Sequence, residues 1–331
     1  MNKKVLITGG AGFIGLHLSR RLLDEGYQVD LIDNFARAVN DKDLKDVLAQ
    51  DRINFHNIDL LSTDEIKKLG NDYDLIFHLA AIIGVTHVMD YPYDVLYKNI
   101  TMLGNIIEFA RRQKKLSRFL FASTSEVYAG TLKHFDLPIP TPEATSLAIT
   151  NLSYPRTSYM LSKIYGEALC HQSGLPFTVF RPHNVYGPRM GMAHVIPEQL
   201  RNAHEAERGD SINVFSVNHT RCFCYIDDAV EMLLRMMLHD DCEGGTLNLG
   251  TQNPELKIKE VVQKCFSVVG KELFINEKPE TLGSPSRRVP DMTKTSSLLE
   301  YESQVSLHSG IAKTYEWYRK NVFDQDLKNA I

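Results

Sequence analysis

Residues 4–26 read KVLITGGAGFIGLHLSRRLLDEG, and this stretch decides the fold. An apolar run with strand character ends at Thr8, four of the seven residues from Gly9 to Gly15 are glycine, and a helix-like pattern then continues to Gly26. Glycine loses more backbone entropy on folding than other residues and brings no side chain to the core. The cluster therefore indicates a place where another group approaches the main chain closely.

The spacing of these glycines matches the dinucleotide-binding fingerprint. Gly10-x-Gly12-x-x-Gly15 has the required spacing, and Gly9-x-x-Gly12-x-x-Gly15 fits in the same place. Glycines here allow the tight turn and the approach of a pyrophosphate, while the helix N-terminus offers unpaired N–H groups. Asp33 ends the next strand, about twenty residues further on, where a carboxylate binds ribose hydroxyls.

Asp33 also predicts which dinucleotide is bound. A carboxylate at this position repels the 2′-phosphate of NADP, so we expect NAD as the cofactor. Arg37 opposes this interpretation, because an arginine just beyond the strand can accept that phosphate and would favour NADP.

The apolar runs that follow alternate with helix-like stretches, from about Asp94 to Lys114 and from about Ser158 to Gln172. This alternation predicts βαβ units with right-handed crossovers. We therefore expect an α/β fold with a doubly wound parallel sheet (Rossmann), whose ligands bind at the carboxyl ends of the strands. The expected strands are KVLITGG, YQVDLID, RINFHNID, YDLIFHLAA, RFLFASTS and FTVFRPHNVYG.

The rhythm changes after about Pro188. Short strands (INVFSV, TLNLG) and short helices (DDAVEMLLRMML, IKEVVQKCFSVV) predict a smaller C-terminal α/β lobe. We expect a dinucleotide-binding domain over residues 1–188 and the substrate lobe over 189–331, with exchange of chain between the two allowed. The stretch from Ala129 to Arg156 carries few periodic signals, and loops of such length are often functional.

Composition and charge argue against several classes of function. The chain has 331 residues, a formal net charge of −4 and no long Lys/Arg block, which disfavours nucleic acid as its main partner. No apolar run approaches the ~18 residues of a membrane span, and the first run stops too early for a signal peptide. Five cysteines without a C-x-x-C predict free thiols in a cytoplasmic protein, with no metal site.

Two segments carry residues suited to acid–base chemistry. Tyr159 and Lys163 stand four residues apart, so a helix places the phenol and the ammonium on one face. A phenol has a pKa of about 10, and a nearby cation lowers it toward the range of a usable base. The second segment, STSE at 123–126, ends a buried strand, where the Thr124 hydroxyl can bridge a reacting oxygen to the tyrosine. A solvated Tyr/Lys pair and a polar strand end are the alternatives.

An ordered series of motifs runs along the chain: TGGAGFIG, HLAA (residues 78–81), Asn99, STSEVY, YMLSK and RPHNVYGP. Together they resemble the extended short-chain dehydrogenase/reductase family, in its nucleotide-sugar epimerase/dehydratase branch. The resemblance covers nearly the whole chain, because RCFCYIDDAV and SRRVPD are similar to substrate-binding segments of that branch.

The resemblance implies an NAD-dependent enzyme and assigns roles to particular residues. The glycines would hold the pyrophosphate, Asp33 the adenosine ribose, and Asp59 with Leu60 the adenine side. The implied cofactor-binding residues are Gly9, Gly12, Phe13, Ile14, Gly15, Asp33, Asn34, Asp59, Leu60, Leu79, Ala80, Ala81, Asn99, Ser123, Tyr159 and Lys163.

The same resemblance implies the catalytic and substrate-binding residues. Tyr159 would remove the proton of a sugar hydroxyl, with Thr124 as its hydroxyl partner, Lys163 tuning it, and Ser125 and Glu126 beside them. A nucleoside-diphosphate sugar would be held by Asn184, Arg189, Arg221 and Arg288. Arginine suits this role because it makes planar, bidentate contacts with phosphate oxygens. Surface ion pairs are the alternative for Arg221 and Arg288.

The reaction itself stays open between several classes. Oxidation at C4 of the sugar gives a ketone, from which epimerisation, decarboxylation or dehydration can follow. We place 4-epimerisation first, a UDP-glucuronate-type decarboxylase second because Thr-Ser-Glu resembles that class, and a 4,6-dehydratase third because Glu126 lacks the usual preceding Asp. A uronate carboxylate would need a cation, for which Arg156, Arg189 and His87 are candidates.

Two further expectations concern association and activity. A non-catalytic NAD-binding protein on the same fold stays as the alternative to an enzyme. Relatives of the family often dimerise through the two helices near Asp94 and Ser158, so we expect a homodimer. The apolar positions that would form its interface, or else the core of one subunit, are Met102, Ile106, Phe109, Ile164 and Ala168.

Overall fold

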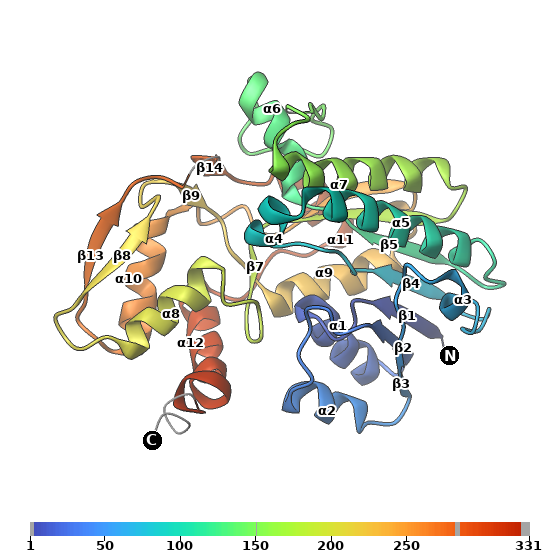
Figure 1. Cartoon of the computed structure of the whole chain (residues 1–331), viewed down its shortest axis with the longest axis horizontal. Helices are drawn as coiled ribbons and strands as arrows, with labels where there is room; N and C mark the ends of the chain where they lie inside the picture. The colour runs from blue at the N-terminus through green and yellow to red at the C-terminus, as the bar shows by residue number, and fades with distance from the viewer. Residues whose placement is uncertain (1–2, 150, 282–284, 326–331) are drawn as a thin grey trace.

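The computed structural model describes residues 3–149, 151–281 and 285–325. Figure 1 shows a larger lobe built around one sheet and a smaller lobe beside it, which holds the last described helix. No helix in the described ranges is long and apolar enough to cross a membrane. All five cysteines are buried and free.

The larger lobe contains a seven-stranded, entirely parallel sheet with the order β11-β6-β5-β4-β1-β2-β3. This is the predicted doubly wound fold, and each predicted strand of the first lobe is present. The last predicted run divides into β6 and the short β7 (Val185–Tyr186). The sheet strands are β1 (Lys4–Thr8), β2 (Gln28–Asp33), β3 (Ile53–Asn57), β4 (Leu75–His78), β5 (Arg118–Ala122), β6 (Phe177–Pro182) and β11 (Gly245–Leu249).

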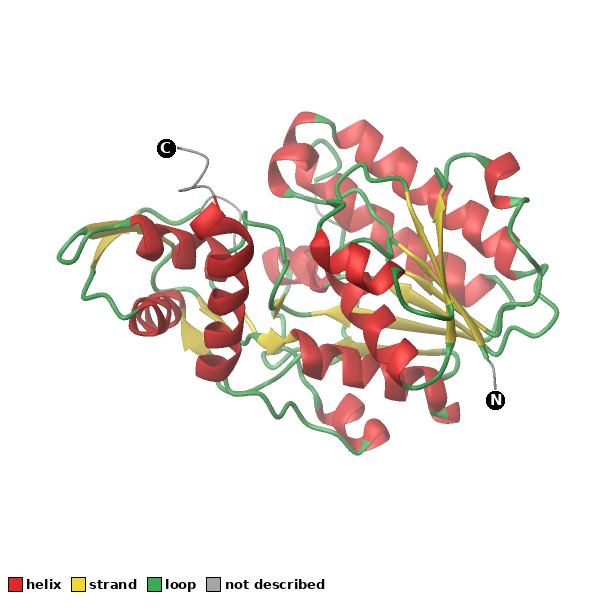
Figure 2. Cartoon of the chain, turned by 90° about the horizontal axis from the view of Figure 1, so that it is seen from below, coloured by secondary structure: helices red, strands yellow, loops and turns green. Residues whose placement is uncertain are grey.

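Helices cover both faces of this sheet, as Figure 2 shows. Alternate residues of β1 point to opposite faces: Val5 and Ile7 join one core cluster with α1, and Leu6 joins the other with α5. A strand buried on both faces must be apolar throughout, which is why these strands read as continuous apolar runs. The helices are α1 (Phe13–Asp24), α2 (Lys42–Leu48), α3 (Thr63–Ile66), α4 (Val85–Asp90), α5 (Pro92–Ala110), α7 (Pro155–Gln172) and α9 (Ile226–Leu238).

Two segments that the sequence assigned to the smaller lobe lie in the larger one. TLNLG forms β11, which pairs with β6 at the edge of the sheet, and α9 packs against α1. Leu247 and Leu249 are completely buried there. Apolar periodicity reports that a segment is buried but not which sheet buries it. The chain therefore returns to the larger lobe after residue 225, and the boundary after residue 188 marks only the first of several crossings.

The smaller lobe is built from short elements around its own core cluster, which includes Val214, Val262 and Phe266. Two short sheets, β13-β8 and β12-β9-β14, lie beside its helices. The elements are α8 (Val195–Glu205), β8 (Ser211–Phe215), β9 (Thr220–Arg221), β10 (Cys224–Tyr225), β12 (Leu256–Lys257), α10 (Ile258–Val269), β13 (Phe274–Lys278), β14 (Arg287–Arg288) and α12 (Leu307–Tyr318), which a π-helical turn extends over Arg319–Phe323. Between the last two, α11 (Thr293–Leu299) returns to the larger lobe and packs on β11 and α9.

The stretch from Ala129 to Arg156 protrudes from the larger lobe and carries the short helix α6 (Ala129–His134), at the top of Figure 1. Thr141, near the middle of this stretch, ties it to the smaller lobe's segment. Thr141 N–H donates to Val289 O (2.9 Å), and Thr141 O accepts from Asp291 N–H (2.9 Å). The stretch therefore lies against the segment that carries Arg288.

Candidate active site

The predicted cofactor site lies where the strand order reverses, between β1 and β4. In doubly wound sheets ligands bind in the crevice at this switch point. The glycine-rich loop leaves β1 here and enters α1 at Phe13, with Gly12 as the N-cap. Phe13 and Ile14 are half-buried in the first turn of α1 and pack against the core.

Packing around the glycines leaves no space for larger residues. A methyl group at Gly9 would lie 2.9 Å from Ala80 N, one at Gly12 would lie 3.0 Å from Gly9 O, and one at Gly15 would lie 2.8 Å from Gly10 Cα. Gly9 also has a φ of +70°, which other residues rarely adopt. These atoms belong to the backbone and cannot move aside, so the loop forms a cradle that any Cβ would fill.

Asp33 stands beside this cradle at the end of β2. Its carboxylate accepts hydrogen bonds from Ala11 N–H (3.2 Å) and Phe35 N–H (2.9 Å). Burial raises the pKa of this carboxyl from its usual range, and the backbone donors oppose the rise. Asp59 and Leu60 follow β3 on the same side, where Asn105 Nδ2 donates to Leu60 O (2.8 Å). Asn34 accepts a hydrogen bond from Ala36 N–H (3.1 Å).

The loop after β4 forms the opposite wall. Leu79 and Ala80 pack on Gly9, and Ala80 N–H donates to Thr8 Oγ1 (3.3 Å). Asn99 lies behind this loop on α5 and holds it by two bonds, accepting from Ile82 N–H (2.7 Å) and donating to Ile82 O (3.1 Å). Ala81 lies between these anchors. Asn99 therefore shapes the wall through the backbone.

The residues present fit NAD. The cradle suits a pyrophosphate, the start of α1 presents N–H groups, and the Asp33 carboxylate stands where the adenosine ribose would lie.

Tyr159 lies on α7 and shares a side-chain hydrogen bond with Thr124, at the end of β5. Thr124 also caps the short 3-10 turn Ser125–Tyr128, because its Oγ1 accepts from Glu126 N–H (3.2 Å). Its hydroxyl proton is therefore available to the tyrosine oxygen. Burial raises the pKa of Tyr159 well above 10, while the Thr124 bond and the charge of Arg37 oppose the rise.

Lys163 was expected to lower the pKa of Tyr159, but it is not among the groups that act on this phenol. Its Nζ lies 5.9 Å from the centre of the Tyr159 ring and donates to Ala122 O (2.7 Å). Burial lowers the pKa of Lys163 to about 8. Helix α7 does place the two side chains on one face. In the protein alone, however, burial raises the pKa of the Tyr159 phenol by more than any lowering that Lys163 causes.

Glu126 forms an ion pair that joins the two lobes. Its Oε1 accepts from Arg288 Nη2 at 2.7 Å. The charge of Arg288 is the main cause that lowers the pKa of Glu126, with further lowering from Arg156 and Arg221. The carboxylate is thus ionised and surrounded by three arginines.

Arg221 and Arg288 are neighbours on the paired strands β9 and β14. Arg221 Nη2 donates to Pro285 O (2.6 Å), and burial lowers the Arg221 pKa to about 10. Asn184 lies nearby with a φ of +41° and donates to Cys222 O (2.9 Å). The structure therefore brings Asn184, Arg221, Arg288 and Glu126 to one end of the site.

The structure places other predicted residues elsewhere. Ser123 donates its hydroxyl proton to Glu167 (2.5 Å), which pairs with the buried Arg181 (2.6 Å), so this hydroxyl belongs to a network beneath the site. Ser125 is buried in the turn after it. His87 packs against Tyr91 on the other side of α4. Arg189 contacts the glycine-rich loop and not the arginine cluster.

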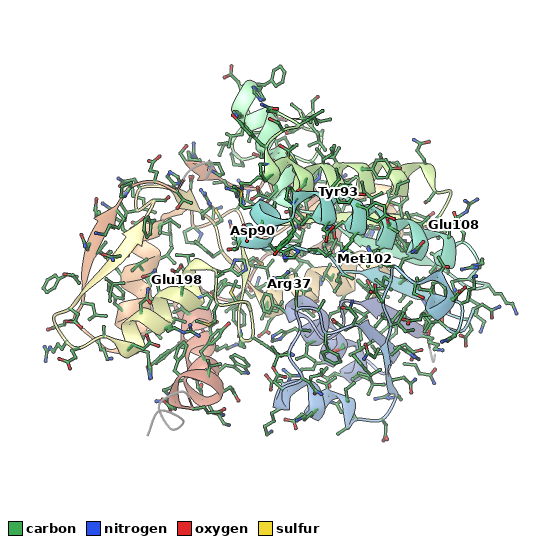
Figure 3. The ribbon with its side chains drawn as sticks, in the orientation of Figure 1. Arg37, Asp90, Tyr93, Met102, Glu108 and Glu198 are labelled. Atoms are coloured by element: carbon green, nitrogen blue, oxygen red, sulfur yellow. The ribbon has the colours of Figure 1, made fainter. Side chains whose placement is uncertain are left out.

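One residue near Tyr159 was not expected there from the sequence, where Arg37 was weighed only as a ligand for the NADP phosphate. The charge of Arg37 acts on Tyr159, and the pKa of His194, at the start of α8, is lowered by burial and further by Arg37. Its Nη2 lies 3.8 Å from the place of a methyl group on Gly84. Figure 3 shows Arg37 between the two lobes. The arginine itself was visible in the sequence, but the direction of its side chain was not.

The geometry of the site can be compared with known proteins. The model of the NAD dependent epimerase/dehydratase family matches residues 5–250. The chain belongs to this family. Membership confirms the predicted family, the use of NAD and the presence of an enzyme on this fold, so a non-catalytic binding protein is not supported.

Similar proteins include decarboxylases and a 4-epimerase of nucleotide-linked uronic acids. A UDP-N-acetyl-alpha-D-glucosaminuronate decarboxylase of Bacillus cytotoxicus is 34% identical, over 97% of this chain and 99% of that protein. A UDP-glucuronic acid decarboxylase of Danio rerio is 32% identical, over 98% of this chain and 74% of that protein. A UDP-glucuronic acid 4-epimerase of Bacillus cereus, solved with UDP-glucuronic acid and NAD, is 27% identical with a TM-score of 0.80, over 96% of this chain and 99% of that one.

Proposed function

We propose that this family member decarboxylates a nucleotide-linked uronic acid through a transient 4-keto sugar, with Tyr159 as the base. From the sequence alone, epimerisation was the first expectation. The order changes because the relatives that match over nearly the whole chain include decarboxylases of UDP-sugar acids, and because of the charges around Glu126.

The observation that carries the proposal is the Glu126–Arg288 ion pair near Tyr159. Arg156 and Arg221 also act on this carboxylate, so three positive charges meet one negative charge. The excess of positive charge matches a substrate that carries both a diphosphate and a carboxylate.

The chain's own groups suit this chemistry. NAD, when bound, would accept the hydride that leaves C4 of the sugar and later return it. Tyr159 acts as the base in its phenolate form, which burial disfavours but the Thr124 hydrogen bond and the charge of Arg37 favour. The phenolate takes the C4 hydroxyl proton while the Thr124 hydroxyl donates to the tyrosine oxygen. The new ketone is β to the carboxylate, so the electrons of the C5–C6 bond move toward the C4 oxygen as carbon dioxide leaves. The enolate formed in this way takes up one proton at C5 from solvent before C4 is reduced. The phenol that results donates a hydrogen bond to the C4 oxygen and returns its proton there when C4 is reduced.

The protonation state of Glu126 favours this reaction over dehydration. Elimination of water needs an acid that protonates the leaving hydroxyl. Arg288 lowers the pKa of Glu126, so the carboxylate is a poor proton donor. Carbon dioxide leaves without taking a proton, so the leaving group needs no acid, and the one proton that C5 takes up can come from solvent.

A 4-epimerase of a nucleotide sugar is the second candidate. The observation that favours it is the likeness over 96% of the chain to a 4-epimerase whose structure holds UDP-glucuronic acid. The same arginines would bind the carboxylate, and the ketone would be reduced on its other face.

One assay separates the candidates. We expect purified protein with NAD to convert UDP-glucuronic acid or UDP-N-acetylglucosaminuronic acid to a product that has lost carbon dioxide, as measured by mass spectrometry. A product of unchanged mass with a new C4 configuration by NMR supports the epimerase instead. Turnover of UDP-glucose but of neither acid contradicts the role assigned to the arginines.

We also propose that two copies associate through the N-terminal ends of α5 and α7. Met102, Ile106 and Phe109 are buried within one subunit, so the expected interface does not use them. Tyr93 and Leu152 are instead 73% and 72% exposed beside a surface hollow between these helices. Exposed apolar side chains gathered in one place are typical of an interface. Light scattering should show a dimer for wild type and Phe274→Asp, and a monomer for Leu152→Asp.

A further inference from the structure

A tight turn after β7 holds an arginine in a backbone conformation that favours glycine. Met190 N–H donates to Gly187 O (3.4 Å), which closes the turn, and Arg189 occupies its third position with a φ of +70°. Turns of this kind usually have glycine there because a side chain costs conformational energy. The Arg189 side chain is only 7% exposed. Such a residue needs contacts that compensate for the backbone.

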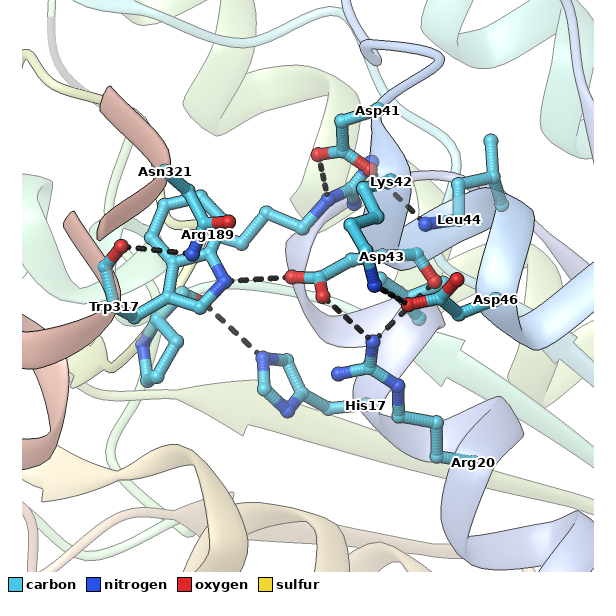
Figure 4. Close-up of polar contacts among 12 residues, drawn as sticks. His17, Arg20, Asp41, Lys42, Asp43, Leu44, Asp46, Arg189, Trp317 and Asn321 are labelled. Carbon is cyan, nitrogen blue, oxygen red and sulfur yellow. Dashed lines mark hydrogen bonds and ion pairs between the residues drawn. The ribbon is translucent and has the colours of Figure 1, made fainter. Parts of the chain in front are cut away.

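The guanidinium of Arg189 is bonded through all three of its nitrogens. Nε pairs with Asp41 Oδ2 (2.6 Å), Nη1 donates to Ala11 O (2.7 Å) and Nη2 donates to Val39 O (2.8 Å). Figure 4 shows the pair with Asp41. These partners come from the glycine-rich loop and from the connection between β2 and α2. Arg189 thus joins the two segments of the larger lobe that border the NAD site.

Both backbone polar groups of Ala11 are hydrogen-bonded to charged side chains. Its N–H donates to Asp33, the predicted ribose ligand, and its carbonyl accepts from Arg189. Asp41 likewise has two roles, because its other oxygen accepts from Leu44 N–H (3.0 Å) and caps α2. The glycine-rich loop therefore depends on a residue about 180 positions away for part of its shape.

The same turn is tied to the smaller lobe. Tyr318 of α12 donates its hydroxyl proton to Met190 O, and Trp317 Nε1 donates to Asp43 Oδ2 (2.6 Å) in α2, as Figure 4 shows for Trp317. On its other side the turn follows directly from β7 and Asn184, which holds the carbonyl of Cys222 next to Arg221. One short turn thus contacts the glycine-rich loop and is continuous in sequence with Asn184, beside Arg221.

We propose that Arg189 is a positioning residue that couples the two binding sites, so that each of NAD and the nucleotide sugar strengthens the binding of the other. The choice of a nucleotide sugar rests on the proposed function. Binding couplings are reciprocal, so the same factor must appear whichever ligand is added first.

The test measures binding and needs no turnover. Calorimetry gives the Kd of NAD with and without saturating UDP, and the Kd of UDP with and without NAD. We expect wild type to show a coupling of about fivefold or more in both directions. Arg189→Gly relieves the cost of the positive φ but removes every contact of the guanidinium. It should weaken NAD binding by about tenfold, and adding one ligand should no longer change the Kd of the other. Arg189→Lys, which keeps the charge but not the fork of donors, should recover part of the coupling.

Two further variants keep the test decisive. Arg208→Gly removes an exposed ion pair with Glu272 in the smaller lobe and should leave the coupling at the wild-type value. Asp41→Asn keeps an oxygen to cap α2 but removes the charge that faces Arg189, and it tests the same contact if Arg189→Gly does not fold. Equal coupling in wild type and in the folded variants overturns the proposal, as does absence of UDP binding or of any coupling in wild type. Failure to decarboxylate a uronate changes only the proposed reaction, because these measurements use UDP and NAD alone.

Discussion

The two ends of the candidate site use opposite means to bind anions. At the NAD end, backbone N–H groups and glycines form the cradle, and the Asp33 carboxylate accepts from Ala11 N–H. At the substrate end, Arg221 and Arg288 lie on two-residue strands beside Glu126. The glycine cradle of the first end is specified by one continuous segment, whereas the charged cluster of the second is assembled from three distant ones. The comparison teaches that backbone sites are readable locally, while side-chain clusters need the tertiary fold.

At the NAD end of the site, Gly15→Ala should have the largest effect on NAD affinity. The added methyl would lie 2.8 Å from Gly10 Cα, and backbone atoms cannot move aside. We expect NAD affinity to fall by more than about 100-fold, since a contact of this kind displaces the loop. Gly104→Ala in α5 is the control, because nothing lies within 4 Å of its new methyl. Retention of NAD by Gly15→Ala in fluorescence titration would contradict the cradle.

Tyr159→Phe should separate chemistry from binding. Loss of the phenol removes the proton acceptor, so kcat should fall by about 10³-fold, within the range for general acid–base groups. NAD affinity should stay within about twofold, because the glycine loop and Asp33 are untouched. Parallel loss of NAD binding would mean that the tyrosine supports the cofactor site and not the reaction.

Arg288→Met tests the substrate end. We expect kcat/KM to fall by about 100-fold, because the site loses both a ligand for anions and the partner of Glu126. The pKa of Glu126 should rise once its main cation is gone, so the acid limb of the kcat/KM profile should move to higher pH.

The neighbouring Arg287→Met is the matched control for this variant. Arg287 is exposed and pairs with Glu255 instead, so its loss should leave the rate and the pH profile unchanged. Equal effects of the two substitutions would show that only the overall positive charge matters.

The smallest expected effect concerns Lys163 and the stability of the protein. Burial lowers its pKa in the folded chain to about 8 from 10.5. Between these values the unfolded chain holds the proton and the folded chain does not, so stability rises with pH. From about pH 7.5 to about pH 9.5, wild type should gain about 2 kcal/mol in the free energy of unfolding relative to Lys163→Met. Parallel pH dependences of the two proteins in urea titrations would show that Lys163 keeps its proton throughout.

Several residues of the site were predictable because the signal is local. The turn at Gly9–Gly15, the carboxylate at Asp33 and the pair Tyr159 and Lys163 depend on spacing within one strand, turn or helix. The protonation states were not predictable. Burial, which no short stretch of sequence records, raises the Tyr159 pKa above the value that the nearby lysine suggested.

The sequence by itself determined the parallel sheet, the cofactor loop and the family, since apolar runs, glycine spacing and ordered motifs act over few residues. Only the tertiary structure decided that β11 joins the larger sheet, that Ser123 bonds Glu167 and that Arg189 reaches Asp41, 148 residues away. The physical reason is that a long polar side chain has many partners of equal chemistry. Which of them it meets depends on burial and on distances that only the folded chain sets.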